Sequence, residues 1–202
     1  MVKRIFYYSR SNKSFIFQLL SILISLIIFV LSIITLNYEQ LAIWQILSSM
    51  LFLALLFELG FGNIFLIKIK QSIDNKKSKD FLLYINSSIF FGKILFAIVF
   101  LFISFFLYFY LSNLKYEILN FNYYFKNGLI CSLAVAIEIL YLSRTYILKA
   151  HDLVDKVYFA LFFQRLAHLF SLIIMLYFEL SLYAFTLSFL LSSIVKNNYL
   201  HS

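Results

Sequence analysis

The sequence has no proline, a single cysteine and only four glycines among its 202 residues. The lone cysteine, Cys131, excludes an internal disulfide and any metal cluster built on cysteine thiolates. No proline-rich or glycine-rich stretch marks a linker, so we expect one domain. The abundance of Ile, Phe, Tyr, Asn and Lys without proline is typical of an AT-rich coding region and favours a bacterial source.

Charged residues are also scarce, at 13 % of the chain, whereas 63 % of the residues are hydrophobic. An ordinary soluble domain is about one quarter charged and about half apolar. The surplus apolar surface needs lipid as its solvent. A membrane-spanning helix takes roughly 20 residues, so a chain of this length can form about six of them. We therefore predict an all-α integral membrane protein in which about six transmembrane helices make one bundle.

The apolar runs set the predicted spans. The last run is too long for one crossing, because 39 residues of helix measure roughly 58 Å at about 1.5 Å per residue. We divide this run near Glu179, while five crossings remain an alternative. The six predicted spans are about residues 15–36, 41–67, 84–111, 128–148, 157–178 and 180–195.

The basic residues indicate the orientation. Twelve Lys and Arg residues fall in the N-terminal segment, the two loops at 68–80 and 149–156 and the C-terminal tail, against two on the other side. Positive charge of this kind keeps a segment cytoplasmic, so we expect both termini inside a multi-pass inner-membrane protein. The formal net charge of +8 is thereby explained by orientation, and nucleic acid is not expected as a partner.

Ionisable residues inside the apolar runs are the main candidates for function, because each costs about 2.5–3.5 kcal/mol at mid-helix on insertion scales. Lys93, Arg165 and His168 could line a hydrated cationic cavity that accepts an anionic head group. Glu138 lies at a depth comparable with Arg165, so the two could form an interhelical pair or a coupling site. Purely structural polar contacts between helices remain the alternative.

The segment from Glu58 to Asn63 places a carboxylate beside Gly60 and Gly62 near the end of the second span. Small residues there allow close approach of helices or a local bend, so we interpret Glu58, Gly60, Gly62 and Asn63 as a helix-packing motif. Contact with a ligand is the alternative. The chain shows no metalloprotease His-Glu spacing and no Gly-x-Ser-x-Gly element, so we predict no catalytic residue, no metal and no cofactor.

Three short segments carry a resemblance to a known family. Residues 39–44 (Glu-Gln-Leu-Ala-Ile-Trp) resemble an element that follows the first helix of bacterial polysaccharide flippases. Residues 58–63 (Glu-Leu-Gly-Phe-Gly-Asn) resemble the element closing their second helix, and residues 148–152 (Leu-Lys-Ala-His-Asp) resemble their loop between helices four and five. The chain thus resembles the N-terminal half of a flippase of the multidrug/oligosaccharidyl-lipid/polysaccharide exporter superfamily.

This resemblance implies a transporter and not an enzyme. The expected activity is translocation of an undecaprenyl-diphosphate-linked oligosaccharide across the inner membrane, for O-antigen (lipopolysaccharide) or capsular polysaccharide biosynthesis. Membrane lipids would surround the chain. Such flippases resemble two facing six-helix bundles, so a second bundle is expected as a homodimer partner or a missing C-terminal half. The alternatives are a membrane enzyme of the same pathway (polymerase or acyltransferase) and a truncated, non-transporting fragment.

Overall fold

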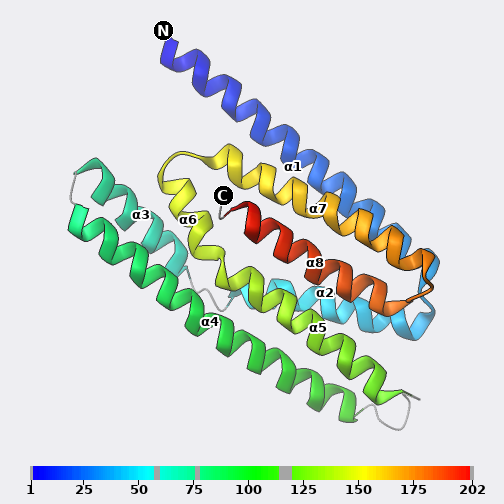
Figure 1. The fold of residues 1–202 in the computed structure, drawn as a ribbon. Helices are drawn as coiled ribbons and strands as arrows, with labels where there is room; N and C mark the ends of the chain where they lie inside the picture. The colour runs from blue at the N-terminus through cyan, green and yellow to red at the C-terminus, as the bar shows by residue number, and fades with distance from the viewer. Residues whose placement is uncertain (1, 57–59, 76–77, 114–119, 201–202) are drawn as a thin grey trace.

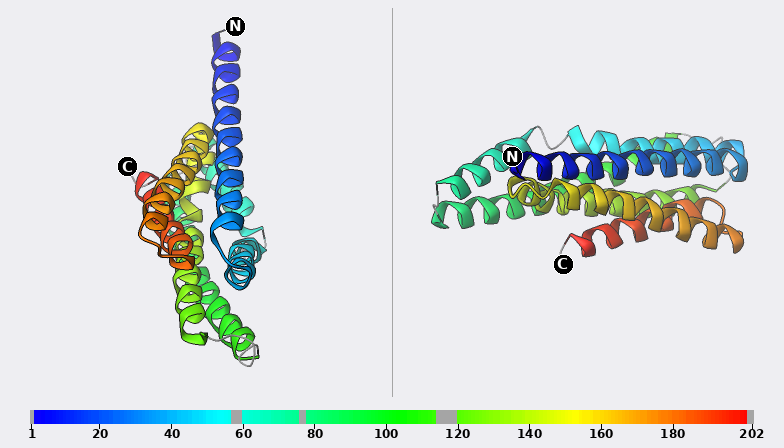
Figure 2. Two further views of the ribbon diagram at one scale, coloured as in Figure 1. Left: turned by 90° about the vertical axis from the view of Figure 1, so that its right-hand side faces the viewer. Right: turned by 90° about the horizontal axis from the view of Figure 1, so that it is seen from above.

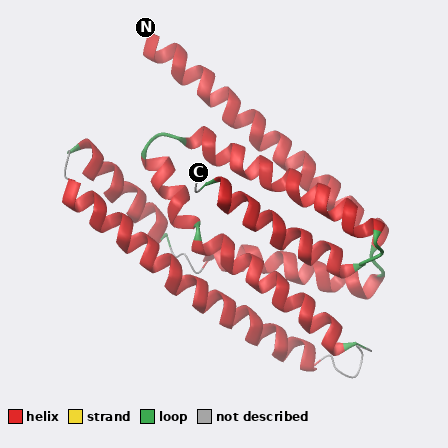
Figure 3. Ribbon diagram, viewed as in Figure 1, coloured by secondary structure: helices red, strands yellow, loops and turns green. Residues whose placement is uncertain are grey.

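The computed structural model describes residues 2–56, 60–75, 78–113 and 120–200, with side chains described for 13–50, 60–75, 79–113 and 120–200. No strand occurs in these ranges, and every regular element is an α-helix (Figure 3). The all-α prediction is therefore confirmed for this part of the chain. The helices are α1 (Val2–Thr35), α2 (Tyr38–Leu56), α3 (Phe61–Asp74), α4 (Ser78–Asn113), α5 (Phe121–Leu140), α6 (Leu142–Ala150), α7 (Val154–Tyr177) and α8 (Leu182–Tyr199).

Four stretches of the described chain are long and apolar enough to cross a membrane, namely residues 13–35, 79–113, 121–150 and 154–177. Large apolar side chains on the first two stretches point away from the bundle, with Ile34 73 % and Phe105 72 % exposed. Extended apolar faces of this kind are stable in lipid and aggregate in water. The chain is therefore a helical membrane protein.

The helices pack as a bundle in which α8 lies on one face, between α5 and α7 (Figures 1 and 2). Going across the bundle, α4 packs on α5, α5 on α8, α8 on α7, and α7 on α1, while α2 packs mainly on α5. The helix α3 lies against α4 and α6. Apolar side chains fill the interior, and the largest fully buried ones include Phe185 of α8, Leu47 of α2 and Leu172 of α7.

The α1–α2 turn, the start of α5 and the α7–α8 turn meet at one end of the bundle. Ser181 donates a hydrogen bond to Gln40 there (2.7 Å), and the Tyr123 and Tyr183 rings lie 5.0 Å apart. At the other end the Phe159 ring contacts both Phe17 and Tyr199, at 5.1 and 5.4 Å. The beginning of α1 and the end of α8 therefore lie at the same end of the bundle.

The structure divides the predicted span 41–67 into two helices, α2 and α3. Gly60 precedes α3 with a φ of 76°, a left-handed conformation in which any other residue is strained. Its carbonyl accepts hydrogen bonds from the amides of Asn63 and Ile64 and so begins α3. The sequence allowed a local bend at these glycines, but hydropathy, which stays high on both sides of Gly60, does not show where α3 begins.

The predicted span 128–148 is interrupted at Tyr141, between α5 and α6. The Tyr141 amide still donates to Ile137, but its carbonyl accepts from Arg144, three residues ahead. On the neighbouring α4, an ideal Cβ added to Gly92 would lie 3.0 Å from the carbonyl oxygen of Leu140. The backbone of α4 thus approaches this break closely because Gly92 has no side chain.

The last apolar run forms two antiparallel helices. The chain leaves α7 after Tyr177 and turns through Glu179 and Ser181, both with positive φ (57° and 50°), before α8 begins at Leu182. The turn lies at the position near Glu179 where the run was divided. As a result α8 returns along α7 and packs between α7 and α5 (Figure 1).

Candidate functional site

Arg165 and His168 line a cavity on one face of α7. They are three residues apart, which places their side chains on the same face of the helix. The cavity has a volume of about 210 Å³. The remaining lining comes from three other helices: Ser25, Ile28 and Phe29 of α1, Trp44 and Ser48 of α2, and Phe189 of α8.

Neither of these two side chains forms a hydrogen bond or an ion pair with another side chain among the described residues. His168 is 2 % exposed, and neither of its ring nitrogens is hydrogen bonded; its ring lies 5.8 Å from that of Phe189. The Arg165 guanidinium makes no hydrogen bond and no ion pair in this part of the chain. A buried polar atom without a partner costs about 1–3 kcal/mol, so the cavity favours a ligand that supplies acceptors.

The cavity opens on the outer surface of the bundle, between α1 and α2. Phe29 of α1 and Ser48 of α2 line it and are both exposed, whereas Ile28 and Trp44 line its buried part. The two helices pack on different neighbours, α1 on α7 and α2 on α5, and do not pack closely on each other within the described residues. A head group can therefore reach Arg165 from the side of the bundle.

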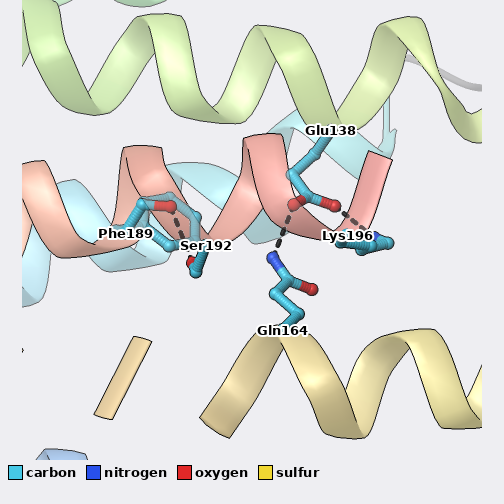
Figure 4. Close-up of polar contacts among 5 residues, drawn as sticks. All are labelled: Glu138, Gln164, Phe189, Ser192 and Lys196. Atoms are coloured by element: carbon cyan, nitrogen blue, oxygen red, sulfur yellow. Dashed lines mark hydrogen bonds and ion pairs between the residues drawn. The ribbon is translucent and has the colours of Figure 1, made fainter. Parts of the chain in front are cut away.

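Glu138 does not pair with Arg165, as had been predicted. One of its carboxylate oxygens accepts a hydrogen bond from Gln164 Nε2 at 2.5 Å, and the other forms an ion pair with Lys196 (Figure 4). The side chains of Glu138 and Lys196 are only 10 % and 13 % exposed. The three residues come from α5, α7 and α8, so this network joins the three helices at the centre of the bundle.

Glu138 makes its close contacts with Gln164 and Lys196, and it attracts the charge of Arg165 only at longer range. Sequence reasoning missed Gln164 and Lys196. A signal existed for Lys196, which directly follows an apolar run and was treated as part of a cytoplasmic tail. The pairing depends on α8 lying between α5 and α7, which hydropathy alone does not reveal.

Lys93 does not join Arg165 and His168. It is exposed on the outer face of α4, a helix that contributes nothing to the lining of the cavity. The expected trio is therefore divided: Arg165 and His168 lie inside the bundle, and the lysine lies outside. A lysine in this position can extend its aliphatic stem along the helix and carry its ammonium group toward the membrane surface.

The structure describes three of the four residues of the predicted helix-packing motif. Glu58 lies outside the described residues. Gly60 starts α3, Asn63 is exposed, and Gly62 is buried against α4 and α6, where it lines a small cavity together with Gly92 and Tyr146. These positions describe close packing of α3 on its neighbours.

A scan against protein-family models, a search of the curated proteins and a search of the solved structures each find no match. Within the described residues, no three side chains among His, Cys, Asp and Glu gather in a way that could hold a metal ion.

Proposed function

We propose that this chain belongs to a transporter that moves an undecaprenyl-diphosphate-linked oligosaccharide across the bacterial inner membrane, for O-antigen or capsular polysaccharide biosynthesis. The observation that carries the proposal is the cavity in which Arg165 and His168 lie buried or half-buried without a hydrogen-bond partner among the described residues. A diphosphate supplies hydrogen-bond acceptors for both side chains and negative charge beside Arg165.

The position of the opening favours an anion that is attached to a lipid. Phe29 and Ser48 form the opening on an outer face whose surroundings on α1 are apolar, with Leu26, Val30 and Ile33 all about half exposed. A polyprenyl tail can stay in lipid beside these side chains while the head group enters the cavity. A water-soluble anion would have to leave water to take the same route.

The topology proposed for this function has six crossings, made by α1, α2 with α3, α4, α5 with α6, α7, and α8. The ring contacts among Phe17, Phe159 and Tyr199 support both termini on one side, and the excess of Lys and Arg makes that side cytoplasmic. The Arg165 cavity then lies within the membrane, as a head-group site requires.

A second helical bundle would complete the proposed transporter. The cavity has walls from α1, α2, α7 and α8 but is open between the first two, so a single bundle cannot enclose a head group. Alternating access normally moves one bundle against another around a central site. We propose that a second copy of this chain, or a separate second half, covers the opening between α1 and α2.

Export of surface polysaccharide tests the proposal. The full chain, alone or with a second bundle, is expressed in a strain that lacks its polysaccharide flippase, and surface glycan is measured together with the abundance of the protein in the membrane. Arg165→Ala should abolish export at unchanged abundance, and Arg165→Lys should retain part of it. Lys93→Ala is the matched control, because Lys93 is outside the cavity, and it should export normally.

Two results would contradict the proposal. Normal export by Arg165→Ala would show that the cavity does not carry the head group. Glycan that reaches the surface without this chain, but with an altered length, would instead identify a polymerase.

A further inference from the structure

A second cavity lies at the end of the bundle where the α1–α2 turn, the start of α5 and the α7–α8 turn meet. Its volume of about 530 Å³ falls within the range of about 300–1,000 Å³ typical of small-ligand sites. The side chains that matter for recognition come from these three places: Glu39 and Gln40 from α2, Tyr123 and Tyr124 from α5, and Glu179 and Tyr183 from the turn and start of α8.

The chemistry of this end cavity is opposite to that of the Arg165 cavity. Among the described residues, two carboxylates line it and no lysine, arginine or histidine does. Glu179 is exposed and its carboxylate has no hydrogen-bond partner among the described residues, while Gln40 keeps its amide N–H groups free of partners in the same part of the chain. The cavity therefore offers both acceptors and donors and repels anions.

The aromatic rings are held in fixed positions. Tyr124 is 5 % exposed and donates a hydrogen bond from its hydroxyl to Glu39 at 3.2 Å. Tyr123 packs edge-to-face on Tyr124 and on Tyr183, with ring centroids 5.3 and 5.0 Å apart. The Tyr123 and Tyr183 rings are only half-buried, so they present apolar surface to the cavity from a rigid support.

We propose that this end cavity binds the neutral sugar residues of a glycan. Carboxylates and amides receive and donate the paired hydrogen bonds that sugar hydroxyls need, and half-exposed tyrosine rings cover the apolar C–H faces of a pyranose. A metal cation would use the carboxylates but would gain nothing from the tyrosines. An anionic ligand would meet Glu39 and Glu179.

The distance between the two cavities fits one ligand with two kinds of recognition. His168 and Glu179 are eleven residues apart on and just after α7, which corresponds to about 16 Å along the helix at about 1.5 Å per residue. A diphosphate in the Arg165 cavity can therefore carry its sugars toward the end cavity. This assignment rests on the proposed function in one respect: the sugars reach the cavity attached to a lipid carrier.

Binding of free sugars tests the assignment separately from transport. The full chain in lipid nanodiscs is titrated with soluble neutral oligosaccharides of two to four hexose and N-acetylhexosamine residues, and binding is measured by calorimetry. Tyr183→Leu should weaken binding about five- to tenfold, because it removes an aromatic face. Tyr177→Leu is the matched control: Tyr177 is 85 % exposed, lies near the same end and does not line the cavity, so binding should be unchanged.

Further variants keep the test decisive. Glu179→Gln changes an exposed side chain without a described partner, so it should fold normally and weaken sugar binding. Arg165→Ala should leave the binding of free sugars unchanged even where it abolishes export, which separates failure of this assignment from failure of the proposed function.

Three results would overturn the assignment: no oligosaccharide of the panel binds, Tyr183→Leu and Tyr177→Leu bind alike, or calcium chloride titrates the cavity through Glu39 and Glu179 while sugars do not.

Discussion

At Gly92 the backbone of α4 lies directly against the carbonyl of Leu140, where α5 ends. Gly128 provides a comparison: an ideal Cβ there would lie 2.9 Å from Leu107 Cδ1, the end of a side chain that can rotate. Both glycines are within helices, so alanine gains about 1 kcal/mol of helix propensity at either position. The difference between the two variants therefore reports the packing contact.

We expect Gly92→Ala to destabilise the protein by about 1–3 kcal/mol, the usual cost of overpacking, because a backbone carbonyl cannot rotate away. Gly128→Ala should cost clearly less. Thermal unfolding in detergent, followed by loss of the monomer peak in size-exclusion chromatography, measures both. Equal unfolding temperatures would show that α4 does not approach the α5–α6 break as closely as the structure describes.

Single residues also show why part of the site could not be predicted. The sequence placed Glu138 and Arg165 at a similar depth in the membrane. Successive residues of a helix point about 100° apart, however, so depth does not specify which residue of α7 faces Glu138. The structure turns Gln164 toward Glu138 and Arg165 toward the cavity. Lys93 shows the same limit, because hydropathy located it within the apolar run without indicating that it faces outward.

Among the elements, α8 depends most on polar contacts. Glu138, Gln164 and Lys196 hold its last turn between α5 and α7, and at its first turns Thr186 donates a hydrogen bond to Asn127 of α5 at 2.8 Å. Removing one member of a buried ion pair leaves a charge without a partner, which costs about 3–5 kcal/mol in soluble proteins. Replacing both members by apolar residues of similar size avoids this penalty.

We therefore expect Glu138→Leu and Lys196→Met each to lower the unfolding temperature strongly, and the double variant to recover most of the loss. The control is Asp152→Asn, which breaks the ion pair between Asp152 and Lys70. The side chain of Lys70 is 44 % exposed and that of Asp152 is 60 % exposed. An exposed pair contributes little, so this variant should unfold like the wild type. If the double variant is as unstable as the sum of the single ones, the pair does not act as a unit.

The elements themselves were partly predictable. Long apolar runs revealed the helices, and the run from 157 to 195 was too long for one helix, which required the division near Glu179. The sequence allowed a bend at Gly60 and Gly62 but did not require one, because the residues on both sides of these glycines are mostly apolar. A glycine pair in a hydrophobic run is compatible with close packing and with a turn, and only the positive φ of Gly60 decides between them.

For the whole molecule, the proposed orientation makes a prediction about access from the two sides of the membrane. With Cys131 changed to Ser, single cysteines are placed at Tyr38, which is 88 % exposed beside the α1–α2 turn, and at Asp74, which is exposed at the end of α3. A membrane-impermeant maleimide should label Tyr38→Cys in intact spheroplasts and label Asp74→Cys only after the membrane is opened.

Labelling of Asp74→Cys alone in intact spheroplasts would mean that the bundle is inserted the other way round. Equal labelling of both positions before opening would place the two helix ends on one side and contradict the six-crossing topology. Tyr177→Cys, at the same end as Tyr38, serves as an internal control and should follow its labelling.

The break at Tyr141 gains a further meaning from the lack of proline. A proline would remove a backbone donor and fix the bend covalently, whereas here the Tyr141 amide is intact and still bonds to Ile137. The bend is maintained by its neighbours, among them the close approach of α4 at Gly92. Because no proline fixes it, a shift of α4 away from Leu140 would leave the backbone at Tyr141 free to continue as one straight helix.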